Sequence, residues 1–99
     1  MIVLLATLHA KPERRDDLAR MLDAIRVDAE SEPGTLPFAV YTVADDATAV
    51  ICSEAYADAA AMAVHREGRA LQELMAVIDD LIDGAPQIAY LEPYSNAST

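Results

Sequence analysis

Hydrophobic and polar positions along this chain repeat with two different periods. Residues 2–9 form a nearly continuous run of β-branched and aliphatic side chains, whose length is typical of a strand buried on both faces. From 12 to 31 the apolar residues instead recur three and four positions apart, which predicts an amphipathic helix. Along the whole chain, the two periods predict strands over 2–9, 37–44, 48–56 and 87–94 and helices over 12–31 and 59–82.

Proline, glycine and aspartate residues mark the ends of these elements. Pro12 suits the first turn of the first helix, where its missing N–H is no loss, and Pro33-Gly34 ends that helix. Asp58 can cap the second helix, and Gly68 is expected to bend or divide it. Each predicted helix therefore has a physical reason to begin and to end near its predicted bounds.

The predicted elements follow one another in the order β-α-β-β-α-β. A short turn at 45–47 separates the two middle strands, so these strands should form an antiparallel hairpin. The simplest closed arrangement is a ferredoxin-like α+β fold, with a four-stranded antiparallel sheet and both helices on one face. We expect a single domain over 1–94, followed by a disordered polar tail over 95–99.

Two helices can cover only one face of such a sheet. Apolar residues make up 54% of the chain, a high share for a small domain. The first and third predicted strands are apolar in both of their alternating sets, whereas a sheet face exposed to water should carry polar residues. We therefore expect the bare face to be covered by the same face of a second copy, in a two-fold homodimer.

Charge and cysteine content limit the partners and the compartment. The formal net charge is -10, so the chain should be repelled by phosphate backbones and anionic lipid surfaces, and we expect neither nucleic acid nor membrane binding. Cys52 is the only cysteine and lies in an apolar run, which indicates a core residue in a reducing, cytoplasmic setting. The apolar N-terminal run has its basic residues after it, the reverse of a signal peptide.

One histidine stands out in the stretch SEAYADAAAMAVHRE, residues 53–67. His65 borders the apolar stripe of the second predicted helix. It is either a partly buried helix-edge histidine or a proton-transferring group at the mouth of a cavity. The alanines around it leave little side-chain volume, so either the helix packs very close to the sheet or space remains for a small ligand.

Two strand residues just before this helix share a face. Glu54 is either a solvated edge residue or a buried acid paired with His65, and Tyr56 is typical of a core aromatic with its hydroxyl at the rim. Tyr41, Tyr90 and His9 are strand residues that could line a cavity. The sequence has no HxxxH or CxxC pair that would suggest a metal site, no glycine-rich phosphate loop and no serine elbow.

The order of elements and three local patterns resemble the antibiotic biosynthesis monooxygenase (ABM) family. The patterns are Lys11-Pro12 after the first strand, Glu32-Pro33-Gly34 before the strand FAVYTV, and SEAYADAAAMAVHRE, which is similar to the family's Glu-x-aromatic, Ala and His arrangement. The resemblance spans about Ile2 to Pro93. It implies a ferredoxin-like dimer with a cavity between sheet and helices in each subunit.

The resemblance also implies a chemistry and a set of site residues. Members that are enzymes oxidise phenolic or quinol-like aromatics with O₂, without a bound metal or flavin, because the substrate anion itself reacts with oxygen. We accordingly expect a cofactor-independent monooxygenase acting on a small aromatic or polyketide substrate, with no metal and no cofactor. The expected catalytic residues are His65, Glu54 and Tyr56, and the expected substrate contacts are Tyr41, Phe38, Met62 and His9.

The sequence departs from the family pattern in ways that keep other functions open. It has no tryptophan at the aromatic position, and Ala70 stands near the place of a second histidine. The first strand has no asparagine, which disfavours haem degradation. A non-catalytic dimeric module that binds a small ligand, and a non-redox isomerase or cyclase on the same scaffold, remain the alternatives.

Overall fold

The fold has the predicted order of elements, except that the second predicted helix is divided in two. The computed structural model describes residues 1–95, so most of the expected tail lies outside the described residues. The elements are β1 (Ile2–His9), α1 (Arg15–Ala29), β2 (Ala39–Val43), β3 (Asp46–Tyr56), α2 (Ala59–Arg66), α3 (Arg69–Leu81) and β4 (Gln87–Leu91). The strands form one antiparallel sheet in the order β2-β3-β1-β4. The ferredoxin-like α+β fold is confirmed.

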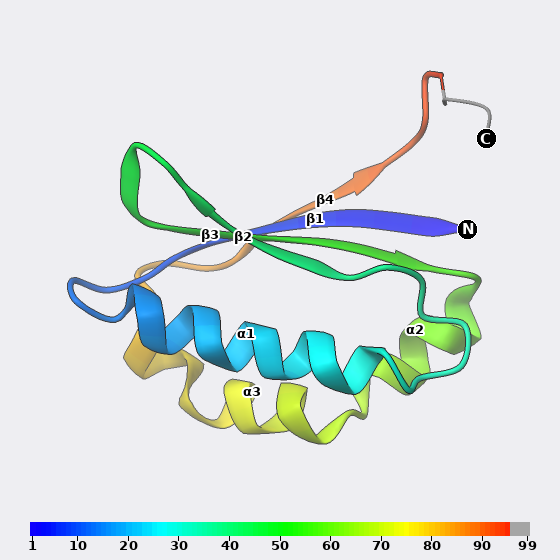
Figure 1. The fold of residues 1–99 in the computed structure, drawn as a ribbon, viewed down its shortest axis with the longest axis horizontal. Helices are drawn as coiled ribbons and strands as arrows, with labels where there is room; N and C mark the ends of the chain where they lie inside the picture. Colours follow the sequence, from blue (N-terminus) through cyan, green and yellow to red (C-terminus); the bar gives the residue numbers. More distant parts are fainter. Residues whose placement is uncertain (96–99) are drawn as a thin grey trace.

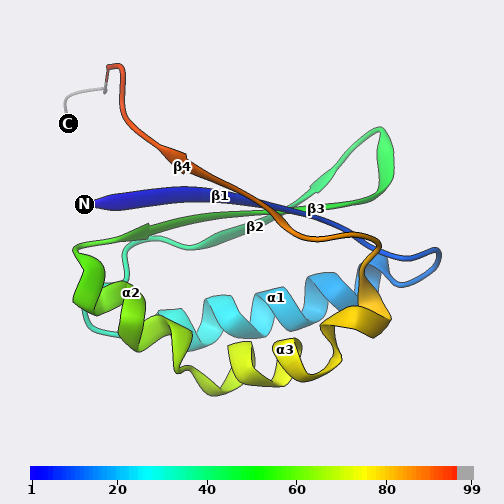
Figure 2. The same cartoon turned by 180° about the vertical axis from the view of Figure 1, so that it is seen from behind.

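The helices all lie on one side of the sheet, as Figure 1 shows and as Figure 2 shows from behind. Helix α1 contacts both β2 and β3, and α3 packs against α1. The helical layer therefore covers one face of the sheet and leaves the opposite face without a helix. None of the helices in the described part of the chain is long and apolar enough to cross a bilayer.

Two boundaries differ from the sequence prediction. Pro12 lies in a turn rather than in the first turn of α1, because Glu13 has a φ of 66° that no right-handed helix accommodates. The hairpin turn is also shorter than predicted, since Val43 already pairs with Asp46. The register slips between Thr42 and Val43, which is the irregularity that allows the tighter connection.

The division between α2 and α3 occurs at Gly68, as the sequence predicted. Gly68 has extended backbone angles, φ −60° and ψ 143°, and is the N-terminal cap of α3. The predicted cap of α2 is also confirmed, because Asp58 Oδ1 accepts a hydrogen bond of 2.8 Å from the Ala61 N–H. These two residues fix where α2 begins and ends, and so fix the position of His65 in its last turn.

The core lies between the sheet and the helices. Alternate residues of β1 and β3 point into it, together with the apolar stripes of α1 and α3. Cys52 is buried among them as predicted. The most completely buried side chains are Tyr56, Leu18, Leu74, Leu81, Val50 and Cys52.

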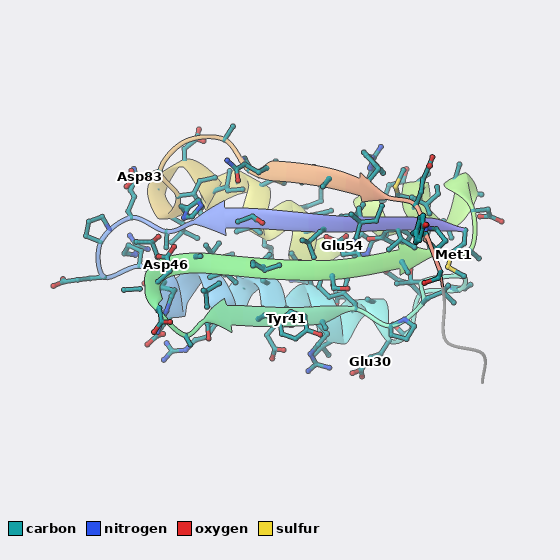
Figure 3. All side chains as sticks on the ribbon, turned by 90° about the horizontal axis from the view of Figure 1, so that it is seen from above. Met1, Glu30, Tyr41, Asp46, Glu54 and Asp83 are labelled. Carbon is teal, nitrogen blue, oxygen red and sulfur yellow. The ribbon has the colours of Figure 1, made fainter. Side chains whose placement is uncertain are left out.

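The other face of the sheet is apolar and carries no helix. Figure 3 looks onto this face, with Tyr41 labelled on β2. The register and alternation of the strands place on it Val3, Leu5, Thr7, His9, Ala39, Tyr41, Val43, Ile51, Ser53, Ala55, Gln87, Ala89 and Leu91, most of which are apolar. We call this set the bare sheet face. Its composition is the basis for expecting a second copy, which stays a prediction.

Candidate functional site

His65 lies at the centre of a buried polar group between α2 and the sheet. Only 5% of the residue is exposed. Its Nδ1 is 2.7 Å from Glu32 Oε1, and the Glu32 side chain is itself only 12% exposed. Because a carboxylate can only accept hydrogen bonds, Nδ1 carries the proton and donates it to Glu32. This contact leaves Nε2 as the nitrogen available to accept a proton.

Small residues make this contact possible. The turn that carries Glu32 also contains Gly34, whose φ is +79°. A Cβ built on Gly34 would lie 2.8 Å from the Ala61 Cβ. The backbone of the turn therefore packs directly against α2, with no room for a side chain at position 34. Gly68 acts in the same way, since a Cβ there would lie 3.1 Å from Glu32 Oε2. The alanines of α2 therefore serve close packing at this point.

A second pair of polar groups faces His65 from β3. Tyr56 donates its hydroxyl proton to Glu54 Oε1 at 2.5 Å. The same oxygen lies 3.9 Å from His65 Nε2. Burial raises the pKa of Tyr56 well above its usual value, and the hydrogen bond that its hydroxyl donates to Glu54 and the negative charge of Glu54 raise it further. Tyr56 thus stays protonated and holds the Glu54 carboxylate in place.

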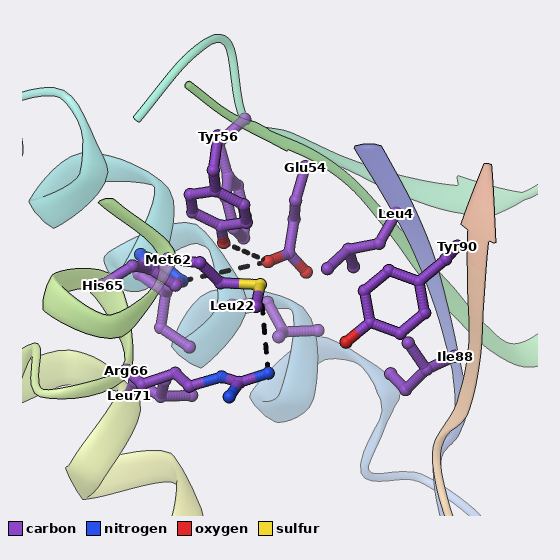
Figure 4. Close-up of a pocket in the computed structure, with 12 residues that line it drawn as sticks. Leu4, Leu22, Glu54, Tyr56, Met62, His65, Arg66, Leu71, Ile88 and Tyr90 are labelled. Carbon is purple, nitrogen blue, oxygen red and sulfur yellow. Dashed lines mark hydrogen bonds and ion pairs between the residues drawn. The ribbon is translucent and has the colours of Figure 1, made fainter. Parts of the chain in front are cut away.

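These polar groups open onto a pocket of about 200 Å³ (Figure 4). Aliphatic side chains from β1, α1 and α3 form one part of the wall, and the aromatic rings of Phe38 and Tyr56 lie 5.7 and 5.2 Å from the His65 ring. Ile88 and Tyr90 line the side formed by β4, where both are exposed. The pocket is lined by Leu4, Leu22, Ile25, Phe38, Glu54, Tyr56, Met62, His65, Arg66, Leu71, Ile88 and Tyr90.

The structure brings together five of the seven residues expected at the site. The five that line the pocket are His65, Glu54, Tyr56, Phe38 and Met62. Glu54 lies within ion-pair distance of His65, but the sequence analysis missed the closer carboxylate, Glu32. Glu32 is part of the Glu32-Pro33-Gly34 pattern quoted for the resemblance. No periodicity in the sequence connects it with His65.

The other two expected residues, Tyr41 and His9, do not line this pocket. Tyr41 pairs with Ile51 on the bare sheet face and is 54% exposed. His9 is at the far end of β1, where its Nδ1 is 3.1 Å from Thr48 Oγ1. Both occupy the alternate set of strand positions, which points away from the helices.

Arg66 and Tyr90 complete the polar lining. Tyr90 is one of the strand tyrosines that could line a cavity, and it does so, whereas the exposed position of Arg66 on α2 gave no sequence signal. Within residues 1–95, no group of three or more His, Cys, Asp or Glu side chains is arranged to hold a metal ion. The chemistry that these side chains can perform themselves is proton transfer and hydrogen bonding inside a mostly apolar pocket.

Comparisons with known proteins agree with this architecture. A protein-family model described as "Antibiotic biosynthesis monooxygenase" matches residues 1–77. The Rv0793 protein of Mycobacterium tuberculosis is 24% identical, with 98% of each chain covered and a TM-score of 0.86. A structure described as an antibiotic biosynthesis monooxygenase is 18% identical, with 96% of this chain and 100% of that chain covered and a TM-score of 0.84.

A third solved structure shows how little such likeness says about activity. The NE2512 protein of Nitrosomonas europaea is 26% identical, with 99% of this chain and 93% of that chain covered and a TM-score of 0.76, and it is described as a protein of unknown function. No curated protein matches the sequence. The solved structures thus support the fold, and the family model supports membership.

Proposed function

The chain belongs to the antibiotic biosynthesis monooxygenase family, and from this premise we propose that it oxidises a small electron-rich aromatic compound with O₂ and without a bound cofactor. The observation that carries the proposal is the buried Glu32–His65 pair, whose second ring nitrogen opens onto an apolar pocket. A base held in one tautomer beside a mostly apolar pocket suits removal of a proton from a weakly acidic carbon or hydroxyl group.

The proposed reaction replaces the two hydrogens of a substrate CH₂ group by one oxygen atom. His65 Nε2 takes one proton, and the substrate carbanion gives an electron to O₂. The resulting radicals combine to form a carbon–oxygen bond. The O–O bond of this peroxide then breaks as the second C–H proton leaves, which forms the carbonyl group and releases the other oxygen atom as water. The substrate supplies all the electrons, so no external reductant is needed.

Each polar residue has a separate role in this proposal. Glu32 keeps the proton on Nδ1 and stabilises the imidazolium that forms when Nε2 accepts a proton. Tyr56 is committed to Glu54, so it serves as an aromatic wall and holds that carboxylate. Phe38 and Met62 supply apolar contacts to the substrate ring. Tyr41 has no role inside the chain's own pocket.

The size of the pocket restricts the substrate. About 200 Å³ is below the range of roughly 300–1,000 Å³ that is typical of pockets for drug-sized ligands. We therefore propose a substrate of one or two rings, in preference to a larger polycyclic compound. The phenolic or ketone oxygen of such a ring would lie among the few polar groups of the lining.

Oxygen uptake tests the proposal directly. Purified protein is given 2-tetralone, a two-ring ketone with an activated CH₂ group, or the three-ring anthrone, and the oxygen consumed is compared with the ketone formed. Incorporation of one atom of isotopically labelled oxygen per product would support a monooxygenase. His65→Gln should lower turnover by about 10²-fold or more, because it removes the base. The matched control is His9→Gln, the other histidine, which should leave turnover unchanged.

The outcomes separate the alternatives. Saturable binding of these compounds without oxygen consumption would indicate a non-catalytic binding module. Consumption of substrate without oxygen uptake would indicate an isomerase or cyclase. Unchanged turnover in His65→Gln would remove this residue from the mechanism.

We also propose that two copies associate through the bare sheet face, which is apolar and carries no helix. An exposed apolar patch of this extent is unusual on a monomer. Sedimentation equilibrium at micromolar concentration should give twice the chain mass of 10.6 kDa. A stable single chain would contradict the proposal.

A further inference from the structure

Within residues 1–95, Arg66 differs from most of the arginines in having no carboxylate within ion-pair distance. Arg14, Arg20, Arg26 and Arg69 each lie within 4.0 Å of a carboxylate three or four residues away in the sequence. Among residues 1–95, the side-chain contact recorded for the Arg66 guanidinium is with the Met62 sulfur at 3.9 Å. A thioether is a weak hydrogen-bond acceptor and carries no charge. The positive charge of Arg66 is therefore available to a ligand.

The backbone of Arg66 is held in place although its side chain is exposed. It occupies the last turn of α2 directly after His65, where the negative end of the helix dipole favours a cation. Its backbone carbonyl accepts a hydrogen bond of 2.8 Å from the Gln72 side chain, which ties the end of α2 to α3. Figure 4 shows the side chain extending from α2 toward the side of the pocket where Ile88 and Tyr90 lie.

Among the residues that the structure describes, Arg66 is the sole lysine or arginine that lines this pocket. The groups that face the same space are Glu54 and Tyr56 from β3, His65 from α2 and Tyr90 from β4, and Glu32 lies behind His65. One carboxylate in the lining and a second behind His65 thus lie near a site in which, on the proposed function, the substrate must become an anion. The negative charges of these carboxylates would disfavour that anion by Coulomb repulsion. A nearby guanidinium offsets this repulsion.

We propose that Arg66 binds the anionic oxygen of the ligand, and that the pocket therefore selects one- or two-ring aromatic compounds that carry an acidic hydroxyl or an enolisable ketone. This inference rests on the proposed function, because it assigns the substrate's oxyanion to the mouth of the same pocket. A guanidinium suits this role because it stays protonated and presents several N–H donors to an oxygen. The field of Arg66 already reaches the site, since its charge acts to lower the pKa of Tyr56 against the larger raising effects of burial and Glu54.

The experiment measures which ionisation state of a phenol the protein prefers, and it needs no turnover. The probe is 4-nitrophenol, a single-ring phenol whose phenolate absorbs visible light. Binding is titrated across a range of pH for the full chain and for Arg66→Gln, Arg66→Lys and Arg69→Gln. Arg69 is the matched control, because it lies at the start of α3, pairs with Glu73 and does not line the pocket.

We expect the wild-type chain to favour the phenolate over the phenol. Arg66→Gln should reduce the ratio of phenolate to phenol affinity by about tenfold, the effect of one charge at a partly screened site. Arg66→Lys should retain most of the preference, and Arg69→Gln should behave as wild type. A ratio within twofold of wild type in Arg66→Gln would overturn the inference, as would equal losses in Arg66→Gln and Arg69→Gln, or no binding of the probe.

Failure of this inference can be distinguished from failure of the proposed function. Oxygen uptake that persists while the phenolate preference is independent of Arg66 would sink the inference alone. A phenolate preference that depends on Arg66, in a chain that never consumes oxygen with 2-tetralone or anthrone, would instead support the inference and count against the monooxygenase.

Discussion

The contact between the Gly34 turn and α2 gives a sharp test of how the site is assembled. Gly34 has a φ of +79° and Gly84 has a φ of +76°, so both lie in the left-handed region. Substitution of either by alanine should cost about 1–2 kcal/mol for that conformation. The surroundings differ, because a Cβ on Gly84 would have no atom within 4 Å, whereas a Cβ on Gly34 would meet the Ala61 Cβ at 2.8 Å.

The steric overlap sets the difference between the two variants. A separation of 2.8 Å is closer than carbon atoms approach in proteins, and the Ala61 methyl has no torsion by which to move away. The backbone of α2 must shift instead, and overpacking of this kind costs typically about 1–3 kcal/mol. We expect Gly34→Ala to lose about 2–5 kcal/mol of unfolding free energy and Gly84→Ala about 1–2 kcal/mol. Any loss of unfolded-state entropy is the same for both and cancels.

Urea denaturation followed by circular dichroism, at one protein concentration for all variants, measures this difference. The urea midpoint should fall further for Gly34→Ala while the slope of the transition stays constant. The shift of α2 should also move His65 away from Glu32 and lower any oxygen uptake. Equal destabilisation of the two variants, within about 0.5 kcal/mol, would show that α2 does not rest on this turn as described.

Two further predictions concern buried groups on β3. Tyr56→Phe leaves Glu54 Oε1 without its hydroxyl donor and should destabilise the fold by about 1–3 kcal/mol in urea titrations, whereas Tyr41→Phe on the bare sheet face should change stability by less than about 0.5 kcal/mol. Burial, with a smaller effect from Glu54, raises the pKa of Cys52 to about 12. The unfolded thiol loses its proton above about 8.5 and the folded thiol keeps it, so stability should fall as pH rises above about 8.5. Cys52→Ala should abolish this part of the slope between about pH 8.5 and 9.5, and the native thiol should resist iodoacetamide at pH 8. An unchanged slope in Cys52→Ala, or fast alkylation of the folded chain, would contradict the assignment.

The sequence was sufficient to predict the order of the helices and strands. It was also sufficient to predict which residues share a face of each strand. The period of two in β3 correctly placed Glu54 and Tyr56 on one face with Cys52, because successive strand side chains must point to opposite sides. Gly68 and Asp58 fixed the limits of α2 by local backbone chemistry, which depends little on the rest of the chain.

The same period, applied strictly, would have removed one of the expected site residues. Phe38 and Tyr41 have opposite parity along one extended segment, so they cannot both face the helices. Both faces of the sheet are rich in apolar residues, and the pattern alone did not say which set the helices cover. The position of α1 against β2 and β3 decided that Phe38 lines the pocket and Tyr41 lies on the bare sheet face.

The tertiary structure alone supplied the partner of His65. Glu32 is 33 positions away in the sequence, in a turn that a local pattern reads only as the end of a helix. Periodicity determines which side chains share a face, since it follows from the geometry of each element. Which turn reaches which helix depends on how closely two backbones can approach, and here Gly34 and Ala61 permit the approach that joins carboxylate to imidazole.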